Sequence, residues 1–108
     1  MASTFKNAVS AAVGTTLVDV YTAPALTSTT IIGLSIANVN TVSITASVKM
    51  TKSGTVVYLI KDAPISLGGS LVVVGGDQKI VLMTGDKISV ISSIAASADV
   101  IMSYLEVA

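Results

Sequence analysis

Hydrophobic and polar residues alternate one by one along most of the chain. The clearest stretch is VSITASVKM, in which Val42, Ile44, Ala46, Val48 and Met50 share one face and Ser, Thr and Lys residues share the other. A period of two is typical of a β-strand with one buried face. Because no stretch sustains the three-to-four spacing of an amphipathic helix, the pattern predicts an all-β protein.

The alternation is interrupted at regular intervals by turn residues such as Asp62-Ala63-Pro64 and Gly75-Gly76-Asp77. Between these breaks the pattern predicts eight strands, at residues 15–22, 29–39, 42–51, 55–61, 64–74, 78–83, 86–93 and 98–107. Many short strands without helices between them favour two antiparallel sheets packed face to face. We therefore expect a single-domain antiparallel β-sandwich over residues 14–108, jelly-roll-like because of the eight strands, with an immunoglobulin-like order as the alternative.

Residues 1–13 lie outside this strand pattern and contain Phe5, the single phenylalanine. We interpret them as an N-terminal arm. Terminal segments are usually frayed unless something holds them in place. The arm is therefore expected either to dock on a neighbouring molecule or to fold back on its own sandwich.

The composition is unusually poor in charge. Of the 108 residues, 52% are hydrophobic and 11% are charged, whereas an ordinary soluble domain has about 25% charged residues. No apolar run approaches the roughly 20 residues of a membrane-spanning helix. Three segments, at residues 56–60, 71–74 and 100–107, are apolar on both faces, so we expect the second face to meet a partner surface; the alternatives are cover by loops and a monomer with a Ser- and Thr-rich exterior.

Catalysis and cofactor binding find little support in the residues. The chain has no cysteine and no histidine, which removes thiolate nucleophiles, the usual zinc ligands and the common proton shuttle at neutral pH. The segment VGGDQKIVL lacks the spacing of a phosphate-binding loop, and its glycines are interpreted as sheet corners. The six carboxylates are scattered and are expected to be solvated. We therefore predict no enzyme activity, catalytic residue, cofactor, metal or small-molecule substrate.

Binding of nucleic acid or glycans is also disfavoured. Lys plus Arg and Asp plus Glu both number six, and all the cations are lysines, so the arginine fork that dominates phosphate and guanine contacts is missing. Sugar-binding sandwiches usually stack aromatic side chains on the ligand. Besides Phe5 the chain offers only Tyr21, Tyr58 and Tyr104, and the last two are expected in the core or at an interface.

Several segments together resemble a known family. FKNAVSAAVGTTLVDVYTAPA, TTIIGLSIANVN, the long run from VVYLIKDAPISLGG to VVVGGDQKIVLMTGDKISVISS, and ADVIMSYLEVA are similar to small structural proteins in the virions of tailed bacteriophages. The likeness spans nearly the whole chain. It implies a β-sandwich that coats or joins parts of the particle and carries no catalytic residues.

The resemblance, together with the low charge and the segments that are apolar on both faces, favours a capsid decoration, or cement, protein; the resemblance implies that it is made in the host cytoplasm and located on the capsid surface of the virion. Its expected partners are itself, as a trimer or another homo-oligomer, and the major capsid protein or another virion protein; nucleic acid and membrane are not expected. A tail, neck or fibre-base component is the alternative, and a host-surface glycan-binding module ranks lower. The predicted interface residues are Phe5, Val9, Val13, Ile101, Leu105 and Val107.

Overall fold

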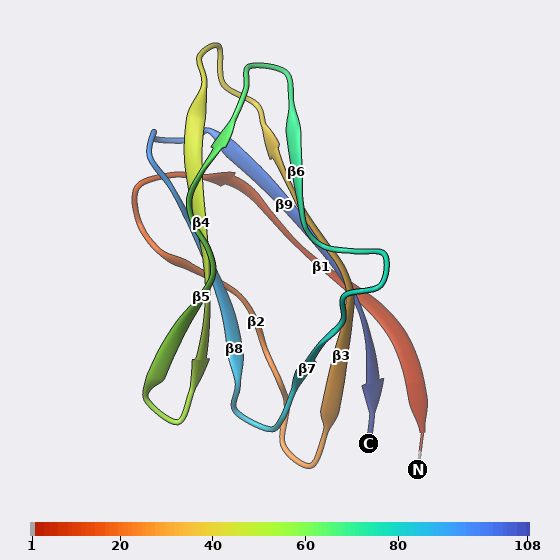
Figure 1. The fold of residues 1–108 in the computed structure, drawn as a ribbon. Coiled ribbons are helices and arrows are strands. Elements are labelled where there is room, and N and C mark those ends of the chain that lie inside the picture. Colours follow the sequence, from red (N-terminus) through yellow and green to blue (C-terminus); the bar gives the residue numbers. More distant parts are fainter. Residues whose placement is uncertain (1) are drawn as a thin grey trace.

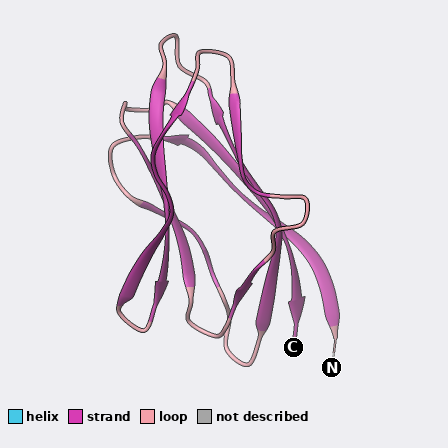
Figure 2. Cartoon of the chain, in the orientation of Figure 1, coloured by secondary structure: helices cyan, strands magenta, loops and turns pink. Residues whose placement is uncertain are grey.

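The computed structural model describes residues 2–108, which form nine β-strands and no helix (Figures 1 and 2). The strands are β1 Ser3–Val13, β2 Val18–Thr22, β3 Ser28–Asn38, β4 Ile44–Lys52, β5 Thr55–Ile65, β6 Ser70–Val74, β7 Ile80–Leu82, β8 Lys87–Ser92 and β9 Ala98–Val107. All strand pairs are antiparallel. The predicted all-β class is confirmed.

The strands form two sheets that face each other. Sheet A has the order β1-β9-β3-β6, with β7 also paired to β3, and sheet B has the order β2-β8-β4-β5. If β6 and β7 count as one interrupted strand, the first strand pairs with the last, the second with the last but one, and so on inward to the β4–β5 hairpin. This nested pairing of a folded antiparallel ribbon is the jelly-roll arrangement. The expected jelly-roll-like sandwich is therefore the observed fold, in preference to the immunoglobulin-like order.

The N-terminal segment differs from the expected arm. Residues 3–13 are strand β1, which pairs with β9 from Ser3↔Val107 to Val13↔Ala98 and forms one edge of sheet A (Figure 1). Of the two possibilities left open by the sequence, the segment folds back on its own sandwich. The sequence predicts an arm because the polar residues in STFKN hide the alternation. An edge strand also has one exposed face and one unpaired side, so its sequence gives little sign that it belongs to a sheet. Met1, the first residue of the expected arm, lies outside the described residues.

The predicted break at Asp62-Ala63-Pro64 is wrong, because β5 continues through it to Ile65. Asp62 has a positive φ of 49°, and its backbone N–H donates to Ser47 Oγ at 2.9 Å. The irregularity is thus a bulge inside an edge strand, a position that also tolerates Pro64. The true turn follows at residues 66–69, where Gly69 N–H donates to the Ser66 carbonyl at 2.8 Å.

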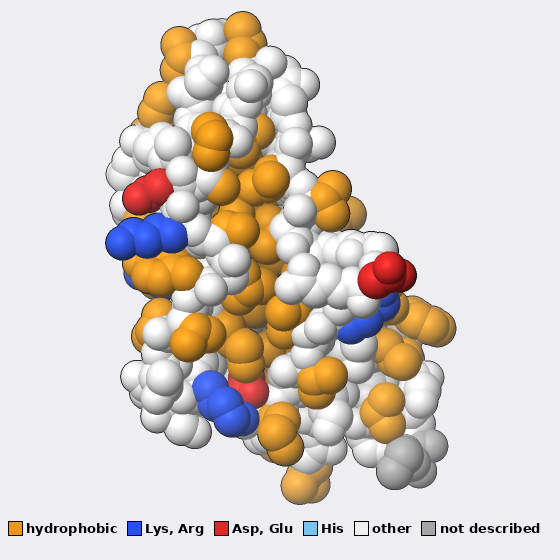
Figure 3. Space-filling model, in the orientation of Figure 1, with side chains coloured by type: hydrophobic (Ala, Val, Ile, Leu, Met, Phe, Trp, Pro, Cys, Tyr) orange, Lys and Arg blue, Asp and Glu red, His pale blue; other side chains and the backbone are white. Residues whose placement is uncertain are grey.

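The core lies between the sheets and is filled by the inward positions of both. It is built from aliphatic side chains, among them Ile31, Leu34 and Met102 of sheet A and Val48 and Ile88 of sheet B, all fully buried. On the side of the molecule seen in Figure 3, an apolar band runs between β4–β5 and β6–β7. Partly buried residues of β5, β6 and β7 also pack against the core: Leu59, Ile60, Leu71, Val73 and Ile80.

The two glycine-aspartate corners lie where the sequence places them. Gly76 and Gly85 both have positive φ, 60° and 87°, in the turns that precede β7 and β8. Asp86, however, is not a solvated turn carboxylate. It is buried, accepts the Met83 N–H at 2.9 Å and forms an ion pair with Lys52 at 3.3 Å. This carboxylate therefore fixes the corner between β7 and β8.

Candidate interaction surface

The outward side of sheet A carries a group of exposed hydrophobic side chains. Strand β9 alternates strictly between buried and exposed residues from Ala98 to Tyr104, and the register with β1 and β3 extends this alternation across the sheet. We call this surface the outer face, defined by Phe5, Val9, Val72, Val81, Ile101, Leu105 and Val107. Phe5 is 74% exposed and Val9 68% exposed, so nothing else in residues 2–108 covers them.

The structure brings five of the six predicted interface residues together on the outer face. Phe5 lies opposite Leu105 in the register of β1 and β9, and Val9 lies opposite Ile101. Val107 lies opposite Ser3 at the end of the same face. Val13 is the exception: a register shift after Ser10 turns it inward, and it is only 1% exposed. Val13 is therefore a core residue, and its predicted interface role is wrong.

The outer face is hollowed near the C-terminal end of β1. The hollow has a volume of about 310 Å³ and is lined by the small side chains of Ala11, Ser35, Ala37 and Ser70 together with Val9, Ile101 and Asp99. The hollow forms because the outward residues at this end of β3 and β6 are Ser35, Ala37 and Ser70, whereas the neighbouring inward residues of β3 are the large Leu34 and Ile36. The face thus combines protruding apolar side chains with a largely apolar depression.

Charge is nearly absent from the outer face. Among residues 2–108, the outward positions of β1, β3, β6, β7 and β9 include one charged residue, Asp99. Its Oδ1 atom accepts the backbone N–H of Ala12 at 2.8 Å. The outward side of sheet B is different, since Asp19 there pairs with Lys87 at 3.3 Å and accepts a hydrogen bond from Ser89 at 2.6 Å. Only sheet A therefore presents a face that water solvates poorly.

Tyr58 lies on the outward side of sheet B and is exposed, so it is not the core residue that its apolar segment suggested; an interface role stays a prediction. Lys49 Nζ and Lys61 Nζ lie 5.2 Å and 5.4 Å from the centroid of its ring. At these distances both ammonium groups are attracted to the ring electrons. A neutral sugar would have to compete with these two lysines for the Tyr58 ring, so Tyr58 is poorly suited to stack on a sugar.

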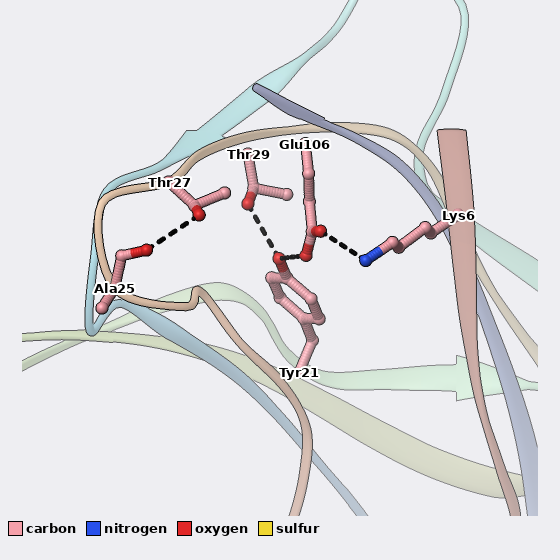
Figure 4. Close-up of polar contacts among 6 residues, drawn as sticks. All are labelled: Lys6, Tyr21, Ala25, Thr27, Thr29 and Glu106. Carbon is pink, nitrogen blue, oxygen red and sulfur yellow. Dashed lines mark hydrogen bonds and ion pairs between the residues drawn. The ribbon is translucent and has the colours of Figure 1, made fainter. Parts of the chain in front are cut away.

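A polar cluster connects the two sheets at the end of the sandwich that holds the β2–β3 turn (Figure 4). Tyr21 of β2 donates its hydroxyl proton to Glu106 Oε2 at 2.5 Å, and its oxygen lies 2.8 Å from Thr29 Oγ1 of β3. Lys6 Nζ of β1 pairs with Glu106 Oε1 at 2.8 Å. The rings of Tyr21 and Tyr104 pack at a centroid distance of 4.3 Å. We call Lys6, Tyr21, Thr29 and Glu106 the inter-sheet clamp.

The titration of the clamp follows from these contacts. The hydrogen bond from Lys6, and then that from Tyr21, lowers the pKa of Glu106. The same contact with Glu106 raises the pKa of Lys6. Burial, followed by the bond to Glu106, raises the pKa of Tyr21 strongly. Each shift stabilises the protonation state that the clamp needs at neutral pH, so the cluster acts as a structural connection and its carboxylate is not poised as an acid or base.

The buried polar side chains are all paired. In the described part of the chain no buried side-chain nitrogen or oxygen lacks a hydrogen-bond partner. Residues 2–108 contain no group of three or more acidic side chains close enough to hold a metal ion. No helix in this range is long and apolar enough to cross a membrane.

Comparisons with known proteins returned no relative: no protein-family model, no curated protein and no solved structure matches the chain.

Sequence reasoning missed the inter-sheet clamp and the hollow. The clamp joins residues from four strands that lie up to 100 positions apart, and the alternation of a single strand does not show which strands meet. Glu106 did give one signal, since it is an acidic residue on the same alternating face as Met102 and Tyr104. The hollow had a signal in the small residues Ser35 and Ala37, which alternate with Leu34 and Ile36.

Proposed function

We propose that the protein is a non-enzymatic structural protein of a bacteriophage virion, and that it coats the capsid as a decoration, or cement, protein. The observation that carries the proposal is the outer face of sheet A, an exposed apolar and almost uncharged surface on a compact jelly roll. The resemblance of the chain to small virion proteins supports the same assignment.

The outer face would act by burying area on the capsid. Apolar contact stabilises association in rough proportion to the area removed from water. On the outer face Phe5 and Val9 protrude, and a hollow lies beside Val9. A capsid surface with matching depressions and protrusions would fit this face closely. A jelly roll suits this work because its inter-sheet core holds the face rigid without help from the partner. Decoration would then add contact area between capsomers and resist the pressure of the packaged genome.

A matched pair of charge substitutions tests the assignment. Ile101 on the outer face and Val56 on the outward side of sheet B are almost equally exposed, at 50% and 51%. We expect Ile101→Glu to weaken binding to capsid shells that lack this protein by at least about tenfold, because a carboxylate would be buried in an apolar contact. Val56→Glu should bind like the unmodified chain. Co-sedimentation with the shells measures both.

Equal binding by the two variants would contradict the role of the outer face. Absence of binding by the unmodified chain, with far-ultraviolet circular dichroism showing a folded protein, would contradict the decoration assignment itself.

A further inference from the structure

The jelly roll leaves edge strands whose free backbone groups can pair with another chain. Proteins usually carry features that hinder such pairing, such as short or irregular strands, bulges, prolines and charges, and we call an edge with them blunted. In the described residues three of the four edges are blunted. The β6–β7 edge is split into strands of five and three residues, and the five-residue β2 is irregular after Asp19. The long β5 has two register shifts, the positive φ of Asp62, and Pro64.

Apart from one lysine, the β1 edge has none of these protections over most of its length. Residues Ser3 to Ser10 pair with β9 in an unbroken register, and this stretch contains neither glycine nor proline. A lysine on an edge strand often discourages pairing. Here Lys6 forms an ion pair with Glu106 at 2.8 Å and its side chain stays 50% exposed, so the edge keeps one charged residue whose charge is partly offset by its partner. The left-handed Ala12, with φ 55°, ends the regular edge.

The backbone groups that face the free side of β1 can be identified. Ala2 and Ala108 exchange both of their backbone hydrogen bonds, at 3.2 Å and 2.9 Å. Because hydrogen-bonded and non-bonded pairs alternate in an antiparallel ladder, the even-numbered residues of β1 bond to β9. The N–H and C=O groups of the odd-numbered residues Phe5, Asn7 and Val9 therefore point to the free side, and their side chains lie on the outer face.

We propose that β1 pairs with β1 of a second copy of this chain, antiparallel about a two-fold axis at Asn7. In this register Phe5 lies opposite Val9 of the second copy, and Ser3 lies opposite Ala11. Both outer faces stay on the same side of the joined sheet. Aromatic and β-branched residues are favourable cross-strand partners, and the pairing uses the regular edge from residue 3 to residue 11 before Ala12 ends it.

The neighbouring registers are less favourable. An axis at Lys6 would place the two Lys6 residues directly opposite each other, and like charges in that position destabilise a sheet. An axis at Ala8 would align Ser3 with the inward-turned Val13 and shorten the ladder. Pairing of β1 with a different edge of a second copy would meet one of the blunted edges. A symmetric contact of β1 with itself is the pairing that avoids all of these obstacles.

The pair would join two five-stranded sheets into one continuous sheet and merge the two outer faces into a single larger apolar surface. The inference depends on the β1 edge and stands independently of the proposed virion role, because the pairing would occur in the purified chain.

Asn7→Lys and Ser103→Lys form the central test. Asn7 and Ser103 lie opposite each other in the β1–β9 register, on the same face and both exposed. Only Asn7 lies on the edge, where the substitution would place two lysines at the two-fold axis. By sedimentation equilibrium we expect the unmodified chain and Ser103→Lys to be dimers, and Asn7→Lys to dissociate at least about tenfold more readily.

A mixing experiment tests the register. Asn7→Asp alone should also dissociate, and an equimolar mixture of Asn7→Asp with Asn7→Lys should recover the dimer because opposite charges then meet at the axis. Circular dichroism and thermal unfolding confirm that each variant is folded. A monomeric or trimeric unmodified chain, an Asn7→Lys dimer of unchanged affinity, equal dissociation of Ser103→Lys, or no recovery on mixing would each overturn the proposal. Capsid binding of Ile101→Glu reports on the proposed function separately.

Discussion

At the scale of single residues, the inter-sheet clamp shows how few polar groups connect the two sheets at the end that holds the β2–β3 turn. Glu106 accepts from both Tyr21 and Lys6, and the Tyr21 hydroxyl also contacts Thr29. Hydrogen bonds that involve a charged group are shorter and stronger than neutral ones. One carboxylate therefore connects β9 to β1 within sheet A and to β2 of sheet B.

The clamp predicts a dependence of stability on acid pH. Because its hydrogen bonds lower the pKa of Glu106, the folded-state pKa lies below the unfolded value of about 4.3. The contribution of Glu106 to stability is then complete above the unfolded pKa and is lost as the pH falls through the folded pKa. Urea unfolding between about pH 3 and pH 6 should show this loss in the unmodified chain and a flatter dependence in Glu106→Gln.

Asp19→Asn provides the control for this experiment. The hydrogen bond from Ser89 lowers the pKa of Asp19 in the same direction, so this carboxylate contributes its own part of the acid loss. Asp19→Asn should keep the part that depends on Glu106. A Glu106→Gln variant with the same pH dependence as the unmodified chain would show that the clamp carries no linked stability.

At the scale of elements, β1 is the strand whose position differs most from the one that the sequence predicts. It completes sheet A beside β9, directs Val9 outward and turns Val13 into the core after a register shift. The N-terminal segment, which the sequence predicts to be a separate arm, is thus an integral strand of the sandwich. The sequence could not show this, because the pairing partner of β1 is the last strand of the chain and strand pairing is a property of the fold.

The two valines of β1 provide a direct test of this position. Val13→Ala should lower the free energy of unfolding by about 1.5 to 3 kcal/mol, because it removes two buried methyl groups and leaves a cavity. Val9→Ala should change it by no more than about 0.5 kcal/mol in the monomer, as is usual at exposed positions. Urea unfolding at low protein concentration measures both. Equal effects of the two substitutions would contradict the assigned faces of β1.

Other elements were largely predictable, and the exceptions have physical reasons. The strand of residues 42–51 corresponds to β4, where Ile44, Ala46 and Val48 are buried as the alternation predicted. The break expected at Pro64 failed because proline and a bulge are tolerated in an edge strand, and the sequence does not reveal which strands are edges. The outward direction of Ile101 followed from the alternation of the last strand, but its grouping with Phe5 and Val9 depends on the β1–β9 pairing, which the sequence does not show.

At the scale of the whole molecule, the low charge of the chain is distributed unevenly. The six lysines and six acidic residues lie mainly at turns, on the outward side of sheet B and in the clamp, and the outer face of sheet A has Asp99 alone among them. Composition predicted that some surface would need a partner. The fold identifies the outer face as the surface that is rigid, apolar and exposed at the same time.

The measurement that tests the proposed function most directly is the copy number of this chain in intact phage particles, by quantitative mass spectrometry against the major capsid protein. A decoration protein that covers the shell through its outer face should be present near one copy per major capsid protein. A ratio of a few per hundred would instead indicate a tail, neck or fibre-base component. Absence of the chain from purified particles would contradict the virion assignment.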